Sequence, residues 1–94
     1  MRRRKKNYFK PEPNAPAPVS VAVKRRVAFS DVDPMGILWH GRYPMYFEQV
    51  NEELGRRCGM TYTDFMREKL RAPIVQTHVD YFASPFLGEE TTIV

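Results

Sequence analysis

The feature that most constrains this fold is one long stretch of helical periodicity set between two stretches of β alternation. Over residues 43–58, apolar side chains recur at the spacing of a helix with one buried face. These positions are Tyr43, Tyr46, Phe47, Val50, Leu54 and Cys58. Residues 19–30 and 72–83 alternate with a period of two instead, which is typical of strands. This order predicts one long helix packed against a small sheet.

Local signals mark both ends of the predicted helix. Pro44 falls in the first turn, where a missing N–H costs no intrahelical hydrogen bond. Gly59 is placed to end the helix in the left-handed conformation that glycine tolerates. Thr61 and Asp64 have the spacing of a capping box, which predicts a short second helix over residues 62–69.

Each expected strand has one apolar face, and the sheet that they form is incomplete. The apolar positions of the first strand are Val19, Val21, Val23, Val27 and Phe29. Arg25 is the one charged residue on that face. A third, β-branched run begins at Thr91 and reaches only Val94, which would leave its backbone groups without partners. We therefore expect the chain to be a truncated N-terminal portion of a domain, with the C-terminal strands missing.

The first 18 residues differ in character from the rest of the chain. A run of basic residues is followed by four prolines, which favour extended conformations, so a disordered basic leader is predicted over residues 1–18. Nine Lys or Arg against one acid give residues 1–30 a charge of +8, whereas six against ten give residues 31–94 a charge of −4. The positive charge therefore lies in residues 1–30, six of its nine cations in the leader, and the net charge of +4 does not predict specific nucleic-acid binding by the folded part.

Cysteine usage and hydropathy favour a cytoplasmic protein. Cys58 is the only cysteine, so neither an internal disulfide nor a cysteine-based metal cluster is expected. No apolar run approaches the roughly 20 residues that a membrane span requires. The basic start also lacks the apolar segment that follows it in an export signal.

Chemistry-bearing side chains concentrate in the loop before the long helix. Asp31 and Asp33 precede His40, and Gly36 and Gly41 supply backbone freedom. The helix start offers N–H groups and a partial positive charge that can polarise a carbonyl. A carboxylate held nearby can attack an acyl carbon or activate water, which suits thioester hydrolysis. The same side chains can serve only local turns and caps, so spacing alone leaves both a catalytic and a structural role open.

This loop also carries a family resemblance. Residues 29–43 read FSDVDPMGILWHGRY, which resembles the signature of the 4-hydroxybenzoyl-CoA thioesterase family, including the group associated with the bacterial Tol–Pal gene cluster. The similarity continues through the helix and into residues 72–81. It implies an α+β hotdog fold over residues 19–94, in which an antiparallel sheet wraps a long helix and active sites lie at a dimer interface.

The resemblance assigns roles residue by residue. It implies that Asp33 is the catalytic carboxylate, acting as nucleophile or as general base, and that His40 lies against the thioester carbonyl. A histidine at that position tilts the expected substrate toward aliphatic acyl-CoA or acyl-carrier thioesters. Gly36, Trp39 and Tyr43 are the predicted substrate-binding residues. Asp31 is a weaker candidate, as an acceptor behind the catalytic groups.

The prediction is therefore an acyl-CoA thioesterase that forms a homodimer or homotetramer. No metal and no cofactor are expected, since coenzyme A is part of the substrate. Two other functions stay open: a second hotdog reaction such as acyl dehydration, and a binding or scaffolding protein that keeps the fold without the activity. Acyl chain length, the residues that bind coenzyme A and the choice between dimer and tetramer are not predicted.

Overall fold

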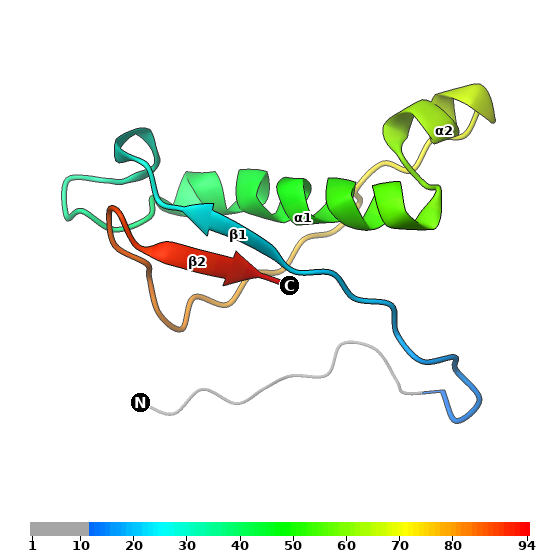
Figure 1. The fold of residues 1–94 in the computed structure, drawn as a ribbon, viewed down its shortest axis with the longest axis horizontal. Helices are drawn as coiled ribbons and strands as arrows, with labels where there is room; N and C mark the ends of the chain where they lie inside the picture. Colours follow the sequence, from blue (N-terminus) through cyan, green and yellow to red (C-terminus); the bar gives the residue numbers. More distant parts are fainter. Residues whose placement is uncertain (1–11) are drawn as a thin grey trace.

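A computed structural model gives the structure of this chain and describes residues 12–94. Most of the predicted leader lies outside these residues, and positions 12–18 are exposed and belong to no helix or strand. The elements are, in order, β1 (Val23–Arg26), η1 (Phe29–Asp31), η2 (His40–Arg42), α1 (Tyr43–Cys58), α2 (Tyr62–Arg67) and β2 (Glu90–Ile93). They form an α+β arrangement of one long helix and a small antiparallel sheet (Figure 1).

The sheet lies against one side of α1. β1 and β2 pair antiparallel, with Val23 opposite Ile93 and Arg26 opposite Glu90, and both strands contact α1. In Figure 1 the two strands run side by side along the helix, and the loop that follows β1 reaches the N-terminal end of α1. The apolar core between these layers is small and consists of Val27, Leu38 and Tyr46, with Val32, Tyr43 and Ile93 packed around it.

The long helix confirms its sequence prediction at both ends. α1 has Pro44 in its first turn, and Gly59 follows its last residue with a φ of 70°. The Gly59 N–H donates to the Gly55 carbonyl, which closes the final turn. The predicted buried face is only partly correct: Tyr46 is 2% exposed, whereas Phe47 is 41% exposed. The sheet packs along the Tyr46 side of the helix, so the neighbouring positions stay open.

The second helix begins at its predicted capping box. The Asp64 N–H donates to Thr61 Oγ1 at 3.2 Å, and the Thr61 N–H donates to Asp64 Oδ2 at 2.9 Å. The helix ends at Arg67, two residues before the predicted end. Lys69 has a positive φ of 56°, which takes the chain out of the helix.

Two strand predictions need correction. The strand expected over residues 19–30 is limited to Val23–Arg26, because its partner β2 is itself four residues long. The strand expected over residues 72–83 is not formed, and Ile74 and Val75 within it are 84% and 92% exposed. A strand exists only through hydrogen bonds to a neighbour, and within residues 12–94 only β1 and β2 form a ladder. No helix among these residues is both long and apolar enough to cross a bilayer.

The close approach at Gly55 generates a test of this packing. A β-carbon at Gly55 would lie 2.7 Å from the Met60 carbonyl oxygen, so the backbone after α1 would have to move. In a free helix, Gly→Ala would stabilise by about 1 kcal/mol. Here we expect the overlap to outweigh that gain, so that Gly55→Ala lowers the free energy of unfolding by about 1 kcal/mol in urea denaturation.

The control is Asn51→Ala, at an exposed position one turn earlier in the same helix. Its helix propensity improves without a new contact, so its stability should rise slightly. A stabilised Gly55→Ala variant would contradict the packing of residue 60 against α1.

Candidate active site

The loop between η1 and η2 folds back on itself. The Trp39 N–H donates to the Asp31 carbonyl at 2.9 Å, which joins the two ends of the loop. Inside this closure, the Asp33 N–H donates to the Ile37 carbonyl at 3.0 Å, and Gly36 makes the turn with a φ of 77°. A β-carbon at Gly36 would have no neighbour within 4 Å beyond the adjacent residues, so the positive φ is what favours glycine there.

A second segment holds the tip of this loop in place. The Leu38 N–H donates to the Pro85 carbonyl, and the Leu87 N–H donates to the Gly36 carbonyl, both at 2.9 Å. The loop is therefore hydrogen-bonded to the turn that leads into β2. Residues far apart in the sequence thus hold its backbone in place, and Leu38 packs in the same core cluster as Tyr46 of α1.

Asp33 is half-buried in this loop. Its Oδ1 accepts a hydrogen bond from the Met35 N–H at 2.8 Å, the geometry of an Asx turn. Within residues 12–94, Oδ2 has no hydrogen-bond partner. The turn role and the catalytic role that the sequence left open are therefore compatible: one oxygen orients the carboxylate, and the other is available.

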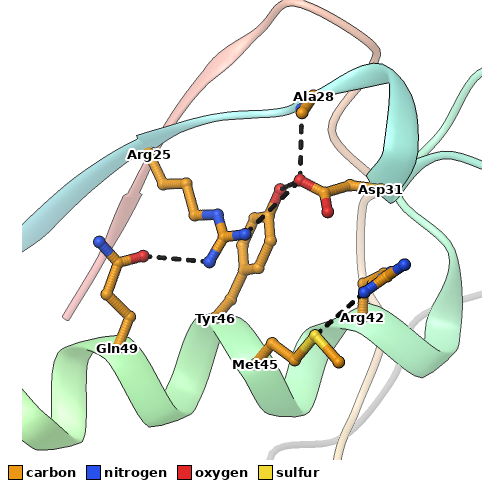
Figure 2. Close-up of polar contacts among 7 residues, drawn as sticks. All are labelled: Arg25, Ala28, Asp31, Arg42, Met45, Tyr46 and Gln49. Atoms are coloured by element: carbon orange, nitrogen blue, oxygen red, sulfur yellow. Dashed lines mark hydrogen bonds and ion pairs between the residues drawn. The ribbon is translucent and has the colours of Figure 1, made fainter.

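Asp31 has the opposite environment and is 4% exposed. Its Oδ2 accepts hydrogen bonds from Tyr46 Oη at 2.8 Å and from the Ala28 N–H at 3.3 Å. The same oxygen lies 3.7 Å from Arg25 Nη2. The Arg25 guanidinium lies 4.1 Å from the centre of the Tyr46 ring and donates to Gln49 Oε1 at 3.2 Å. Figure 2 shows these side chains converging from β1, the loop and α1.

The surroundings of Asp31 determine its charge. Burial by itself raises the pKa of the Asp31 carboxyl, but the hydrogen bonds from Tyr46 and Ala28 and the charges of Arg25 and Arg42 outweigh it, so the pKa falls below its ordinary value. For Tyr46, burial and then the hydrogen bond to Asp31 raise the pKa to about 12. The pair is therefore a carboxylate and a neutral phenol over the physiological range.

The helix start lies directly after the loop. η2 continues into α1, since Tyr43 already has helical dihedral angles. The first paired N–H is that of Arg42, which donates to the Trp39 carbonyl at 2.9 Å, so the N–H groups of His40 and Gly41 precede the hydrogen-bonded turns. The His40 side chain is exposed, and its ring lies 5.1 Å from the Trp39 ring. A β-carbon at Gly41 would overlap the Trp39 indole.

Tyr43, a predicted substrate contact, packs at the edge of the core. Its ring meets that of Tyr81 edge-to-face, with centroids 4.9 Å apart. Its hydroxyl is buried and has no hydrogen-bond partner among residues 12–94. The substrate-binding role of Tyr43 stays a prediction, as do those of Gly36 and Trp39.

Two hollows of the described surface lie elsewhere along α1. One of about 530 Å³ is lined by Leu54, Phe65 and Ile74 among others, and a second of about 1200 Å³ is lined by Phe47 and Val79 among others. None of the predicted site residues lines either hollow. Among residues 12–94, no three His, Cys, Asp or Glu side chains converge as metal ligands would.

Arg25, Tyr46 and Gln49 are the residues that sequence reasoning missed. The helical periodicity predicts that Tyr46 lies on the apolar side of the helix, but it does not indicate the hydrogen bond to Asp31. The available signal was Arg25, the one charged residue on the apolar face of its strand. A cation on a core-facing position needs an anion nearby, and Asp31 is that anion.

Comparison with known proteins identifies the superfamily to which this chain belongs. Residues 27–94 match the model of the thioesterase-like superfamily, and the chain belongs to that superfamily. The match includes the whole loop, both 3₁₀ turns and α1.

Two individual proteins are similar to the chain. One is the Bacillus subtilis (strain 168) protein named "Putative acyl-CoA thioesterase YneP", which is 28% identical over 68 residues, or 72% of this chain and 49% of that protein. The other is the crystal structure of a hypothetical protein from Aquifex aeolicus, with a TM-score of 0.69 and 27% identity, covering 76% of this chain and 58% of that one. The chain thus spans about half the length of the curated relative.

The buried Asp31–Tyr46 contact predicts a specific loss of stability. Tyr46→Phe keeps the ring and removes the hydroxyl, which leaves a buried carboxylate with one donor fewer. We expect the free energy of unfolding to fall by about 1–3 kcal/mol in urea denaturation. Tyr62→Phe is the matched control, since Tyr62 is 58% exposed, and it should leave stability unchanged. Equal stability of the two variants would contradict the hydrogen bond.

The two pKa shifts predict a window of pH for this contribution. The folded pKa of Asp31 is lowered, so its stabilisation is present above the ordinary Asp pKa of about 4 and is lost as pH falls further. The folded pKa of Tyr46 is raised, so its contribution is present below about pH 10 and is lost as pH rises toward 12.

Asp31→Asn should therefore flatten the acid arm of a plot of unfolding free energy against pH. Glu68→Gln, at an exposed carboxylate, should leave that arm unchanged. An unaltered acid arm in Asp31→Asn would show that the pKa of Asp31 is not lowered by folding.

Proposed function

We propose that the protein hydrolyses acyl-CoA or acyl-carrier thioesters, with Asp33 as the catalytic carboxylate. The observation that carries this function is the division between the two aspartates of the loop. Asp31 is buried, and its Oδ2 takes two hydrogen bonds and the charge of Arg25. Asp33 is half-buried, and its one hydrogen bond among residues 12–94 comes from the Met35 N–H. Membership of the thioesterase-like superfamily supports the same reaction class.

The chemistry needs one carboxylate and one site for a developing oxyanion. The Asp33 carboxylate either attacks the thioester carbon, forming an anhydride that water then cleaves, or removes a proton from the attacking water. In both cases the C–S bond breaks and the thiol group leaves with a proton, while the acyl group ends as a carboxylic acid. The two routes differ only in whether an acyl-enzyme forms.

The start of η2 is suited to the oxyanion. The N–H groups of His40 and Gly41 precede the first hydrogen-bonded turn, and the helix dipole adds partial positive charge there. The exposed His40 ring can donate a further hydrogen bond or a proton to the leaving sulfur. Both roles depend on the thioester carbonyl lying between the loop and the helix start.

Several finer properties belong to this proposal. Gly36, Trp39 and Tyr43 are proposed to contact the substrate, and aliphatic acyl groups are preferred because His40 occupies the polarising position. Assembly into a homodimer or homotetramer and a cytoplasmic location also stay predictions. The relative from Bacillus subtilis named as an acyl-CoA thioesterase supports coenzyme A as the carrier.

Asp33→Asn tests the assignment of the catalytic group. The amide can still accept the Met35 hydrogen bond, but it cannot act as nucleophile or base. We expect kcat for acyl-CoA hydrolysis to fall by at least about 100-fold, with thermal stability close to wild type. The readout is release of free thiol from a series of acyl-CoA chain lengths.

Glu68→Gln is the control for Asp33→Asn, because it removes one exposed carboxylate outside the loop, and it should retain full activity. Normal turnover by Asp33→Asn would reject Asp33 as the catalytic group. A folded wild-type protein that hydrolyses no chain length would instead reject the activity. Dehydration of 3-hydroxyacyl thioesters in its place would point to the other hotdog reaction.

A further inference from the structure

A cluster of buried and half-buried polar side chains lies beneath the proposed site. It consists of Arg25, Asp31, Tyr46 and Gln49, and it is called here the Asp31 cluster. One carboxylate oxygen, Asp31 Oδ2, takes contacts from a strand residue, a helix residue and a backbone N–H (Figure 2). The cluster therefore ties β1, the loop and α1 together at a single atom.

Asp31 is connected through the backbone to both proposed catalytic residues. Asp33 is two residues beyond Asp31 along the chain. The Asp31 carbonyl also accepts the Trp39 N–H at 2.9 Å, and His40 is the next residue after Trp39. A shift of Asp31 relative to α1 would therefore move Asp33 relative to His40 and the helix start.

Stability alone does not account for a polar cluster at this place. Burying a carboxylate is costly, and apolar side chains of similar volume often stabilise a core as well or better. Directional hydrogen bonds differ from apolar packing because they specify one position of the loop on the helix. Tyr46 is 2% exposed and projects from the first turn of α1, so it relates the loop to the helix start itself.

We propose that Tyr46 and Arg25, acting through Asp31, are positioning residues that hold Asp33 in register with His40 and the helix start. The role rests on the proposed function, since it concerns the geometry of that reaction. Neither residue touches the substrate in this arrangement. Their effect on the rate comes from keeping the carboxylate and the oxyanion donors at productive separations.

Tyr46→Phe is the central variant, because it retains the ring beneath the Arg25 guanidinium and removes only the hydroxyl. We expect kcat for acyl-CoA hydrolysis to fall about 10-fold while KM changes less than about 2-fold, since substrate contacts stay in place and the reacting groups are displaced. Asp31→Asn should produce a similar loss. The double variant should lose little more than either single variant, because both changes break one connection.

Val21→Ala separates positioning from a general loss of stability. Val21 is 7% exposed and belongs to neither the loop nor the Asp31 cluster, so the substitution destabilises the core without touching that connection. At a temperature where both variants are fully folded, Val21→Ala should keep the wild-type kcat. A parallel loss of kcat in Val21→Ala and Tyr46→Phe would overturn the positioning role.

Amide hydrogen exchange tests the attachment without relying on turnover. The N–H groups of Asp33 and Trp39 are hydrogen-bonded within the loop, and that of Leu38 is bonded to the Pro85 carbonyl. In Tyr46→Phe we expect these three to exchange at least about 10-fold faster, relative to amides in the middle of α1, than in wild type or Val21→Ala. Unchanged exchange together with unchanged kcat would reject the proposal.

Inactive wild-type protein with accelerated loop exchange in Tyr46→Phe would have a different meaning. It would reject thioester hydrolysis and keep the attachment of the loop by the Asp31 cluster. Active wild-type protein whose Tyr46→Phe variant shows neither effect would keep the hydrolase and reject the positioning residues. The two failures are thus distinguishable in the same set of proteins.

Discussion

The contact between the Asp31 carboxylate and the Tyr46 hydroxyl is the interaction on which the rest of the described structure depends. Between them, the two side chains join the loop to the helix, and Arg25 extends the connection to the sheet. The apolar core beside it consists of few residues, with Val27 the most deeply buried. In so small a core, one satisfied polar cluster fixes the arrangement of three elements that apolar contacts alone would leave less specified.

Asp31 and Asp33 carry the same functional group, but the fold gives their carboxylates different environments. Asp31 lies at the end of η1, where its side chain is buried, accepts hydrogen bonds from Tyr46 and Ala28, and pairs with the charge of Arg25. Asp33 lies inside the loop that the hydrogen bond from Trp39 to Asp31 closes, and its side chain is half-buried. Burial with partners makes one carboxylate a fixed structural charge, while partial exposure leaves the other able to react. The proposed hydrolase depends on this division.

The described part of the chain also shows the limits of reading strands from alternation. Residues 72–83 alternate as regularly as residues 19–30. Only residues 19–30 contain a strand, and it is limited to Val23–Arg26. Alternation states which face a strand would bury but supplies no hydrogen-bond partner. The partner of β1 is β2, more than 60 residues away in the chain, so pairing is decided by the tertiary structure.

The sequence by itself determined the parts that depend on neighbouring residues. Both helix starts, the left-handed end at Gly59 and the turn at Gly36 follow from local dihedral preferences and local hydrogen bonds, and they were predictable to within two residues. The family signature also singled out Asp33 as the candidate catalytic group, and the structure leaves that assignment to experiment. Only the tertiary structure decided that Asp31 is buried, because its partners Arg25 and Tyr46 come from a separate strand and helix. Their meeting is a property of the packed chain, and no local pattern of residues encodes it.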